Sequence, residues 1–269
     1  MGRQVLDSAE LNGWLERYEK MLIEDQKGGL EEPDDVLDAR RFTQPVRRGF
    51  CSASENKMVS DVVVTSADQN DHTLLTRLDN IFYRTLYGQE RDDSFEPDFP
   101  TEVLVARKNV HLVGGIWYAI EPTQVYEGFL YLDRMVVVDR ERGQNIGTKM
   151  LVNLLEYVPE GKSVILHAWD KAIPFYVCNG FFSAGEDVEG EDGCFFRKMV
   201  LPLDWGTFQD YKQEGWQEEL QAATRDEIFF RKIRKALEKN CEESFTELSS
   251  NPFTAVLYRN AGIDHRLLK

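Results

Sequence analysis

The sequence has no long apolar run, few cysteines and no excess of basic residues. No stretch approaches the roughly 20 consecutive apolar residues of a membrane-spanning helix, so we expect no membrane association. No basic region followed by an apolar stretch opens the sequence, so we expect no secretory signal. With 47 acidic and 32 basic residues, the formal net charge is −15. A chain of this charge repels the phosphates of nucleic acids, which excludes general nucleic-acid binding.

The four cysteines are scattered, without Cys-x-x-Cys or Cys/His spacing. This arrangement predicts no metal site and no disulfide framework, and it favours a reducing, cytoplasmic compartment. A hydrophobic fraction of 42%, with 12% aromatic residues, is enough for a packed core and excludes a disordered chain. A chain of 269 residues holds one sizeable domain with appendages, or two small domains.

Hydrophobic periodicity divides the chain into three parts. They are a helical N-terminal extension and linker (residues 1–58), an α/β domain (residues 59–203) and a helical C-terminal extension (residues 204–269). Apolar residues at three- and four-residue steps predict one helix within residues 7–28. In the C-terminal part, Thr224 and Glu227 have capping-box spacing, and Asn251-Pro252 is a further helix-start signal.

Strand-like and helix-like runs alternate in the central part, in an order that indicates a mixed sheet. The expected strands are residues 61–65, 102–107, 111–120, 128–138, 163–168, 181–186 and 194–201. The expected helices are residues 74–86, 145–157 and 172–178. Short connections between the early strands indicate an antiparallel meander. A helix between the strands at 128–138 and 163–168 indicates that these two strands are parallel.

The most informative segment runs from Met135 to Leu151. A β-branched strand leads into a glycine-containing turn, which opens directly into an amphipathic helix. This arrangement points unpaired backbone N–H groups and the positive end of the helix dipole at the occupant of the turn, usually a phosphate. The turn is neither a Walker A loop nor a dinucleotide-binding Gly-x-Gly-x-x-Gly. An ordinary strand-to-helix connection is the alternative interpretation.

This segment resembles the acetyl-CoA-binding motif of the GNAT superfamily of acetyltransferases, Gln/Arg-x-x-Gly-x-Gly/Ala. Arg142 falls on the first position of the motif and Gly147 on the last, while Asn145 stands where the middle glycine is expected. Asparagine tolerates the left-handed backbone region, so the turn remains compatible with the motif. Farther along, Ala172-Ile-Pro-Phe-Tyr-Val-Cys-Asn-Gly-Phe181 is similar to the family signature Ala-x-x-Phe/Leu-Tyr-x-x-x-Gly-Phe.

The resemblance implies a GNAT-like α/β fold: a mixed, mostly antiparallel sheet with a splayed parallel strand pair and helices on both faces. It also implies that acetyl-CoA is a co-substrate and that its pantetheine arm enters between the splayed strands. In this interpretation, backbone groups of Met135 and Val137 pair with the arm, and amides of the turn hold the pyrophosphate. The expected cofactor-binding residues are Met135, Val136, Val137, Arg142, Gly143, Gln144, Asn145, Gly147 and Thr148.

The resemblance also suggests catalytic residues. Tyr176 matches the tyrosine that, in many members, donates a proton to the departing CoA thiolate; a packing role is the alternative. A phenol with a pKa near 10 suits that leaving group. Period-two alternation places one set of residues on a single strand face: Glu127, Phe129, Tyr131, Asp133, Met135 and Val137. Asp133 and Glu127 are the candidate bases, although a structural ion pair is an equally good interpretation of Asp133.

The sequence therefore predicts an N-acetyltransferase that moves an acetyl group from acetyl-CoA to a primary amine, of a small molecule or a peptide, by direct attack in a ternary complex. The alternative is a non-catalytic CoA-binding or protein-interaction module that retains the fold. Acidic stretches at residues 90–102 and 186–192 are suited to attract a cationic acceptor. Solvated surface loops are the other interpretation of these stretches. The sequence does not specify an oligomeric state.

Overall fold

The computed structural model describes part of the chain. The described residues are 62–68, 71–72, 75–76, 79, 99–109, 111–138, 141–189, 195–213, 216–218, 221, 231, 234 and 251–263. The predicted N-terminal extension lies outside them. So do most of the predicted helix after Thr224 and the first acidic stretch up to residue 98. Among the described residues, no helix combines the length and the apolar character needed to cross a membrane.

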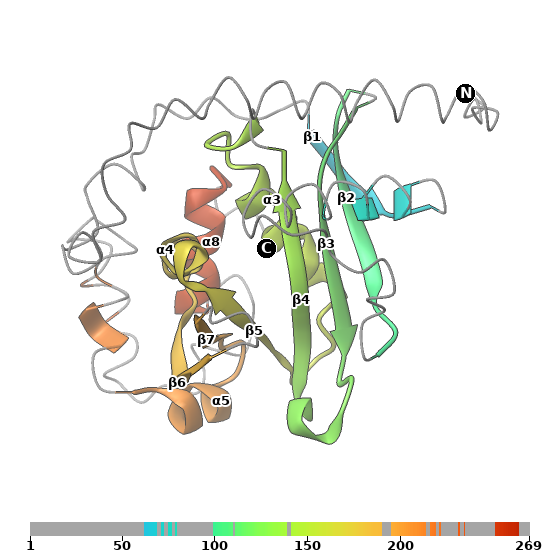
Figure 1. Ribbon diagram of the computed structural model, residues 1–269. Helices are drawn as coiled ribbons and strands as arrows, with labels where there is room; N and C mark the ends of the chain where they lie inside the picture. Colours follow the sequence, from blue (N-terminus) through green and yellow to red (C-terminus); the bar gives the residue numbers. More distant parts are fainter. Residues whose placement is uncertain are drawn as a thin grey trace, which may run out of the picture.

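Seven strands form one sheet in the order β1-β2-β3-β4-β5-β7-β6 (Figure 1). The strands are β1 (Val62–Ser66), β2 (Glu102–Lys108), β3 (His111–Ile120), β4 (Phe129–Val137), β5 (Ser163–Trp169), β6 (Phe182–Glu189) and β7 (Phe195–Leu201). The helices are α3 (Ile146–Leu154), α4 (Ile173–Cys178), α5 (Trp205–Tyr211) and α8 (Pro252–Asn260). Short 3-10 helices are η2 (Gln124–Tyr126), η4 (Leu155–Tyr157) and η5 (Asp170–Ala172). Only the β4–β5 pair is parallel among the described strands, which confirms the predicted mixed sheet.

Both faces of the central strands are covered. The interior of β3, from Leu112 to Ala119, is buried throughout, as its uninterrupted small and apolar sequence requires. A Cβ added to Gly114 would lie 3.3 Å from the Cε of Met150 in α3. A Cβ added to Gly115, on the opposite face, would lie 2.5 Å from Leu75, a residue in helical conformation. The small residues of β3 therefore allow helical segments to approach the sheet from both sides.

The helix α8 packs into the same hydrophobic core as the sheet, although it lies in the predicted C-terminal extension. Its residues from Pro252 to Tyr258 are all buried, and it stands between α3 and α4, contacting both (Figure 1). Asn251 caps its N-terminus by accepting the N–H of Phe253 at 2.9 Å, as the Asn-Pro signal predicts. The amide of Asn251 also donates to the carbonyl of Pro202 at 3.0 Å.

Gly180 allows α8 to dock against the turn after α4. Its backbone has φ +89°, and an added Cβ would lie 2.5 Å from the carbonyl oxygen of Phe253. A larger residue would therefore push the two segments apart. Nearby, the side-chain amide of Asn260 donates to the carbonyl of Cys178, the last residue of α4. The end of α4 is thus held by a helix more than 70 residues farther along the chain.

Candidate active site

The sheet opens between its two parallel strands. β4 and β5 pair over only four residues, from Phe129 with Ser163 to Leu132 with Leu166. Beyond this point β5 continues to Trp169 along β7, while β4 continues to Val137 along β3. The two strands therefore splay apart, which confirms the predicted splayed pair.

The backbone of β4 faces this gap at alternate residues. Val138 donates its N–H to the carbonyl of Val113 in β3, at 3.0 Å. Because backbone directions alternate along a paired strand, the N–H and C=O groups of Met135 and Val137 point away from β3 and toward the gap. Those of Val136 point toward β3. Of the three expected cofactor-binding residues on β4, Met135 and Val137 thus offer backbone groups to the gap, as expected for the pantetheine arm, and Val136 does not.

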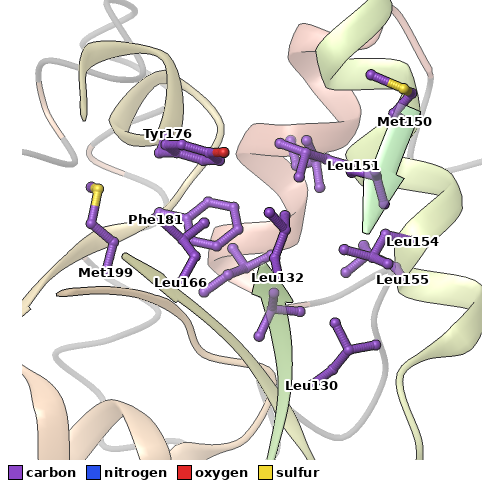
Figure 2. Packing of buried hydrophobic residues seen from close by; sticks show 14 of the residues in the cluster. Leu130, Leu132, Met150, Leu151, Leu154, Leu155, Leu166, Tyr176, Phe181 and Met199 are labelled. Atoms are coloured by element: carbon purple, nitrogen blue, oxygen red, sulfur yellow. The ribbon is translucent and has the colours of Figure 1, made fainter. Parts of the chain in front are cut away.

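A β-bulge at Asp133 changes which side chains of β4 share a face. In the β3–β4 register, Leu132 is opposite Tyr118 and Arg134 is opposite Trp117, so Asp133 is an extra residue inserted in β4. Leu132 packs in the core with side chains of α3 (Figure 2), so Tyr131 faces the opposite side. Met135, beyond the bulge, again lies against α3. The prediction that Tyr131 and Met135 share one face is therefore wrong, because strict alternation does not survive an inserted residue.

The turn after β4 has the backbone that a phosphate-binding turn requires. Asn145 adopts the left-handed conformation, with φ 60° and ψ 17°, so it takes the place of the glycine expected there. Gly143 also has a positive φ, of 74°. The side chain of Asn145 makes no capping hydrogen bond to the first turn of α3. The N–H groups at the start of α3 therefore remain available to an anionic ligand.

The side chains of the turn are anchored on its flanks. Lys108 of β2 donates to Glu141 at 2.9 Å and to the amide oxygen of Gln144 at 3.0 Å. Arg142 is exposed, and its Nε donates to the carbonyl of Val137 at 3.2 Å. The charge of Lys108 is thus balanced by Glu141, while the exposed guanidinium of Arg142 lies against the backbone of Val137. A cation at this place favours an anionic ligand.

Gly147 brings α3, α4 and the open part of β4 together. A Cβ added there would lie 2.9 Å from the Cζ of Phe175 in α4 and 3.7 Å from the Cε of Met135 in β4. Thr148, the next residue, is buried. The glycine at the last motif position thus permits close packing of α4 against the turn, in addition to any approach of a ligand.

Tyr176 lies on α4, at the same face of the sheet as α3. Its ring packs against Phe175 and Phe181, with centroid distances of 5.2 and 5.4 Å, and it belongs to the core shown in Figure 2. Burial raises the pKa of the Tyr176 phenol above its ordinary value. The phenol therefore keeps its proton throughout the neutral range, as a proton donor to a leaving thiolate must.

The two candidate carboxylates lie in different places. Asp133 is the first residue of β4 beyond the last β4–β5 pair. Its Oδ2 lies 3.0 Å from the Nε of Arg134. The Nη1 of Arg134 donates to Oδ2 of Asp79 at 3.0 Å. Glu127 is exposed and precedes β4, at the end of the strand opposite to the gap. The structure therefore puts Asp133, but not Glu127, at the apex of the gap, and it puts Asp133 in an ion pair.

His167 is a candidate that the sequence analysis did not single out. It is the first residue of β5 beyond the last β4–β5 pair, and its ring lies 6.0 Å from that of Tyr131. Burial, and to a smaller extent the charge of Lys198, lower the pKa of His167. A neutral imidazole can accept a proton near pH 7. The sequence feature that could have pointed to His167 is that it is the one titratable side chain in the strand from Ser163 to Trp169.

Other reactive groups near the site are few. Cys178 is disulfide-bonded, a single bond that the scattered cysteines did not indicate. The other three cysteines lie outside the described residues. Within the part of the chain that the structure describes, no group of three or more His, Cys, Asp or Glu side chains is placed to hold a metal ion.

The segment that contains the gap, the turn and the buried tyrosine is similar to a known family. Residues 73–181 match the family model described as the acetyltransferase (GNAT) family. This segment contains β2 to β5, the turn and α4. The match confirms the predicted resemblance to the GNAT acetyltransferases over this segment. A search of curated protein sequences gave no match.

Solved structures of acyltransferases share similarity over about half of this chain. An acyl-CoA N-acyltransferase from Pseudomonas aeruginosa is 17% identical, with 53% of this chain and 99% of that chain covered and a TM-score of 0.43. Arabidopsis thaliana Naa50, solved with the bisubstrate analogue CoA-Ac-MVNAL, is 20% identical, with coverages of 52% and 97% and a TM-score of 0.41. Spermidine N-acetyltransferase from Vibrio cholerae, solved with CoA and spermine, is 16% identical, with coverages of 52% and 95% and a TM-score of 0.42.

Proposed function

We propose that this domain transfers the acetyl group of acetyl-CoA to a primary amine by direct attack within a ternary complex. The observation that carries the proposal is the end of the β4–β5 pairing at Leu132 and Leu166. The gap that opens there is accessible from both faces of the sheet. The phosphate-binding turn and Tyr176 lie on the α3 face, whereas Tyr131 lies on the other face.

The α3 face suits the acyl donor. Backbone groups of Met135 and Val137 that face the gap would pair with the amides of the pantetheine arm, as an added strand would. The left-handed turn at Asn145 and the first N–H groups of α3 would hold the pyrophosphate. In this arrangement Tyr176 is the donor of the proton that the departing thiolate takes up.

The opposite face suits the amine. The nitrogen attacks the thioester carbonyl, a C–N bond forms, the C–S bond breaks, and the ammonium proton passes to a base. His167 fits this role because burial and Lys198 lower its pKa and keep it neutral. Asp133 stays a second candidate, acting directly or through water, although it is held in an ion pair with Arg134. Glu127 is the weakest candidate, because it lies at the far end of β4.

The primary amine is the acceptor class that this chemistry specifies. Naa50 was solved with the bisubstrate analogue CoA-Ac-MVNAL, and the spermidine N-acetyltransferase with CoA and spermine. A cationic acceptor would be attracted by the acidic stretches of this chain. The side chains of Glu186 and of residues 188–192 are outside the described residues. The acceptor assay described next therefore compares peptides with polyamines.

Release of free CoA tests the proposal. The full-length protein is incubated with acetyl-CoA and, separately, with a polyamine, an amino sugar and a panel of short peptides with free N-termini. Thiol release that depends on one amine class supports the proposal and identifies the acceptor. Binding of acetyl-CoA without amine-dependent release would instead support the non-catalytic CoA-binding module. The N-acetylated product is identified by mass spectrometry.

A further inference from the structure

Asp79, Arg134 and Asp133 form a charged cluster beside the apex of the gap. The Nη1 of Arg134 donates to Oδ2 of Asp79 at 3.0 Å, and its Nε lies 3.0 Å from Oδ2 of Asp133. The three side chains are between 14% and 19% exposed, so salt screens these ion pairs less than it screens surface pairs. One guanidinium thus joins two carboxylates through different nitrogen atoms, which its planar fork permits.

The cluster lies on the face of the sheet that is opposite to α3. Arg134 is opposite Trp117 in the β3–β4 register, and Trp117 shares a face with Gly115, two residues earlier on β3. A Cβ added to Gly115 would meet Leu75. Asp79 follows Leu75 by four residues and both are helical, so the two side chains lie on the same side of a helix. Arg134 therefore connects the face of β4 proposed for the amine with the helical residues that cover it.

The β-bulge explains how two neighbouring residues of one strand form an ion pair. In a regular strand, the side chains of Asp133 and Arg134 would point to opposite faces of the sheet. The inserted residue changes the direction of its side chain, and the 3.0 Å ion pair requires both side chains to reach the same place. The bulge directly follows Leu132, where the β4–β5 pairing ends. The carboxylate of Asp133 is therefore held at the apex of the gap, on the side proposed for the amine.

We propose that Arg134 is a positioning residue: anchored by Asp79, it holds the carboxylate of Asp133 at the apex of the gap, where this carboxylate receives the ammonium group of the acceptor. The three side chains together carry one net negative charge, which favours an ammonium group. Because Asp133 is held in one orientation, the acceptor loses less free energy in ordering it. The kinetic role rests on the proposed acetyl transfer, whereas the arrangement of the cluster does not.

The kinetic test compares Arg134→Lys with Arg107→Lys. Lysine keeps the positive charge, but its single nitrogen cannot hold two carboxylates as the guanidinium does. Arg107 is a matched control, because it pairs with Asp71 and so ties the helical residues just before Leu75 to β2 instead of β4. We expect Arg134→Lys to lower kcat/KM for the amine about tenfold, with the Kd of acetyl-CoA within about twofold of the original protein. Arg107→Lys should change neither quantity by more than about twofold. An unchanged kcat/KM in Arg134→Lys, or equal losses in the two variants, would overturn the proposal.

A double-mutant cycle tests whether Arg134 acts through Asp133. Asp133→Asn removes the charge of the carboxylate and keeps the size of the side chain. In that background Arg134→Lys should have no further effect, so kcat/KM for the amine in the double variant should match that of Asp133→Asn within about twofold. Losses that multiply would show that Arg134 acts independently of Asp133 and would refute the proposal. Asp79→Asn, which removes only the anchoring charge, should lower kcat/KM in the same direction and replaces Arg134→Lys if that variant does not fold.

A spectrum tests the arrangement of the cluster without any turnover. Among the nitrogen-15 signals of the arginine Nε–H groups, that of Arg134 is the one that Arg134→Lys removes. We expect Asp133→Asn and Asp79→Asn each to shift this signal, because their carboxylates lie 3.0 Å from Nε and Nη1. A signal that Asp133→Asn leaves in place would contradict the proposal. Absence of thiol release with every amine would refute the acetyl transfer and the kinetic role with it, and this spectrum would still decide whether Arg134 holds Asp133.

Discussion

Replacing Asn145 by alanine should cost free energy at the turn that we propose binds the pyrophosphate. The backbone there is left-handed, with φ 60°, a conformation that costs an ordinary L-residue about 1–2 kcal/mol. Asparagine is among the residues that adopt it with least strain. We therefore expect the alanine side chain to add about 1 kcal/mol of strain.

This strain appears in one of two measurable quantities. Ile146 and Thr148, directly after the turn, are 1% and 5% exposed, so packing holds the turn in place. If the turn keeps its shape, the free energy of unfolding falls by about 1 kcal/mol. If the turn relaxes in the free protein, acetyl-CoA must restore it, and the Kd rises about fivefold, the equivalent of 1 kcal/mol.

Urea denaturation and calorimetric titration with acetyl-CoA measure the two quantities on the same protein. Asn145→Gly is the matched control, since glycine adopts the left-handed region freely. We expect this control to bind acetyl-CoA as the original protein does, with a free energy of unfolding within about 0.5 kcal/mol of it. An alanine variant unchanged in both quantities, or a glycine variant that loses affinity, would refute the assigned role of the turn.

Three further substitutions test the tyrosine, the histidine and the docking of α8. Tyr176→Phe should lower kcat about a hundredfold with unchanged acetyl-CoA affinity, and steady-state kinetics with an unaltered kcat would remove Tyr176 from the mechanism. Because the folded-state pKa of His167 is lowered, its contribution to stability is full above its ordinary pKa of about 6.5 and is lost as the pH falls below it. His167→Gln should flatten this acidic arm of the stability curve, and a curve of unchanged slope would contradict the assignment. Gly180→Ala should destabilise the fold by clearly more than Gly161→Ala in denaturation experiments. Both glycines have positive φ, but only at Gly180 does an added Cβ meet backbone, at 2.5 Å from Phe253 O. Equal losses would mean that α8 does not depend on this close approach.

The order of elements could be predicted from local pattern. The expected strand at residues 111–120 coincides with β3, and the ends of most other described strands differ from expectation by one to three residues. The parallel pair followed from the helix between β4 and β5, because such a crossover forces parallel strands. The turn after Val137 could be predicted because Gly143 and Asn145 are local signals of positive φ.

The rest of the site depends on long-range contacts. The bulge at Asp133 exists only in the register of β4 against β3, so strict alternation misplaced the side chains before it. His167 became a candidate because its ring lies near that of Tyr131, which belongs to another strand. The burial of α8 depends on the close approach of Phe253 to Gly180. Periodicity describes one segment at a time and cannot report such contacts.

The central claim, that the gap and its turn bind acetyl-CoA, is tested most directly by calorimetric titration of Asn145→Asp. Aspartate has the size of asparagine and also tolerates the left-handed region, so this change adds only a negative charge at the turn. We predict micromolar binding of acetyl-CoA to the original protein, and at least a tenfold higher Kd, about 1.4 kcal/mol, for the variant. Equal binding by the two proteins, or no binding by the original protein at millimolar acetyl-CoA, would contradict the account.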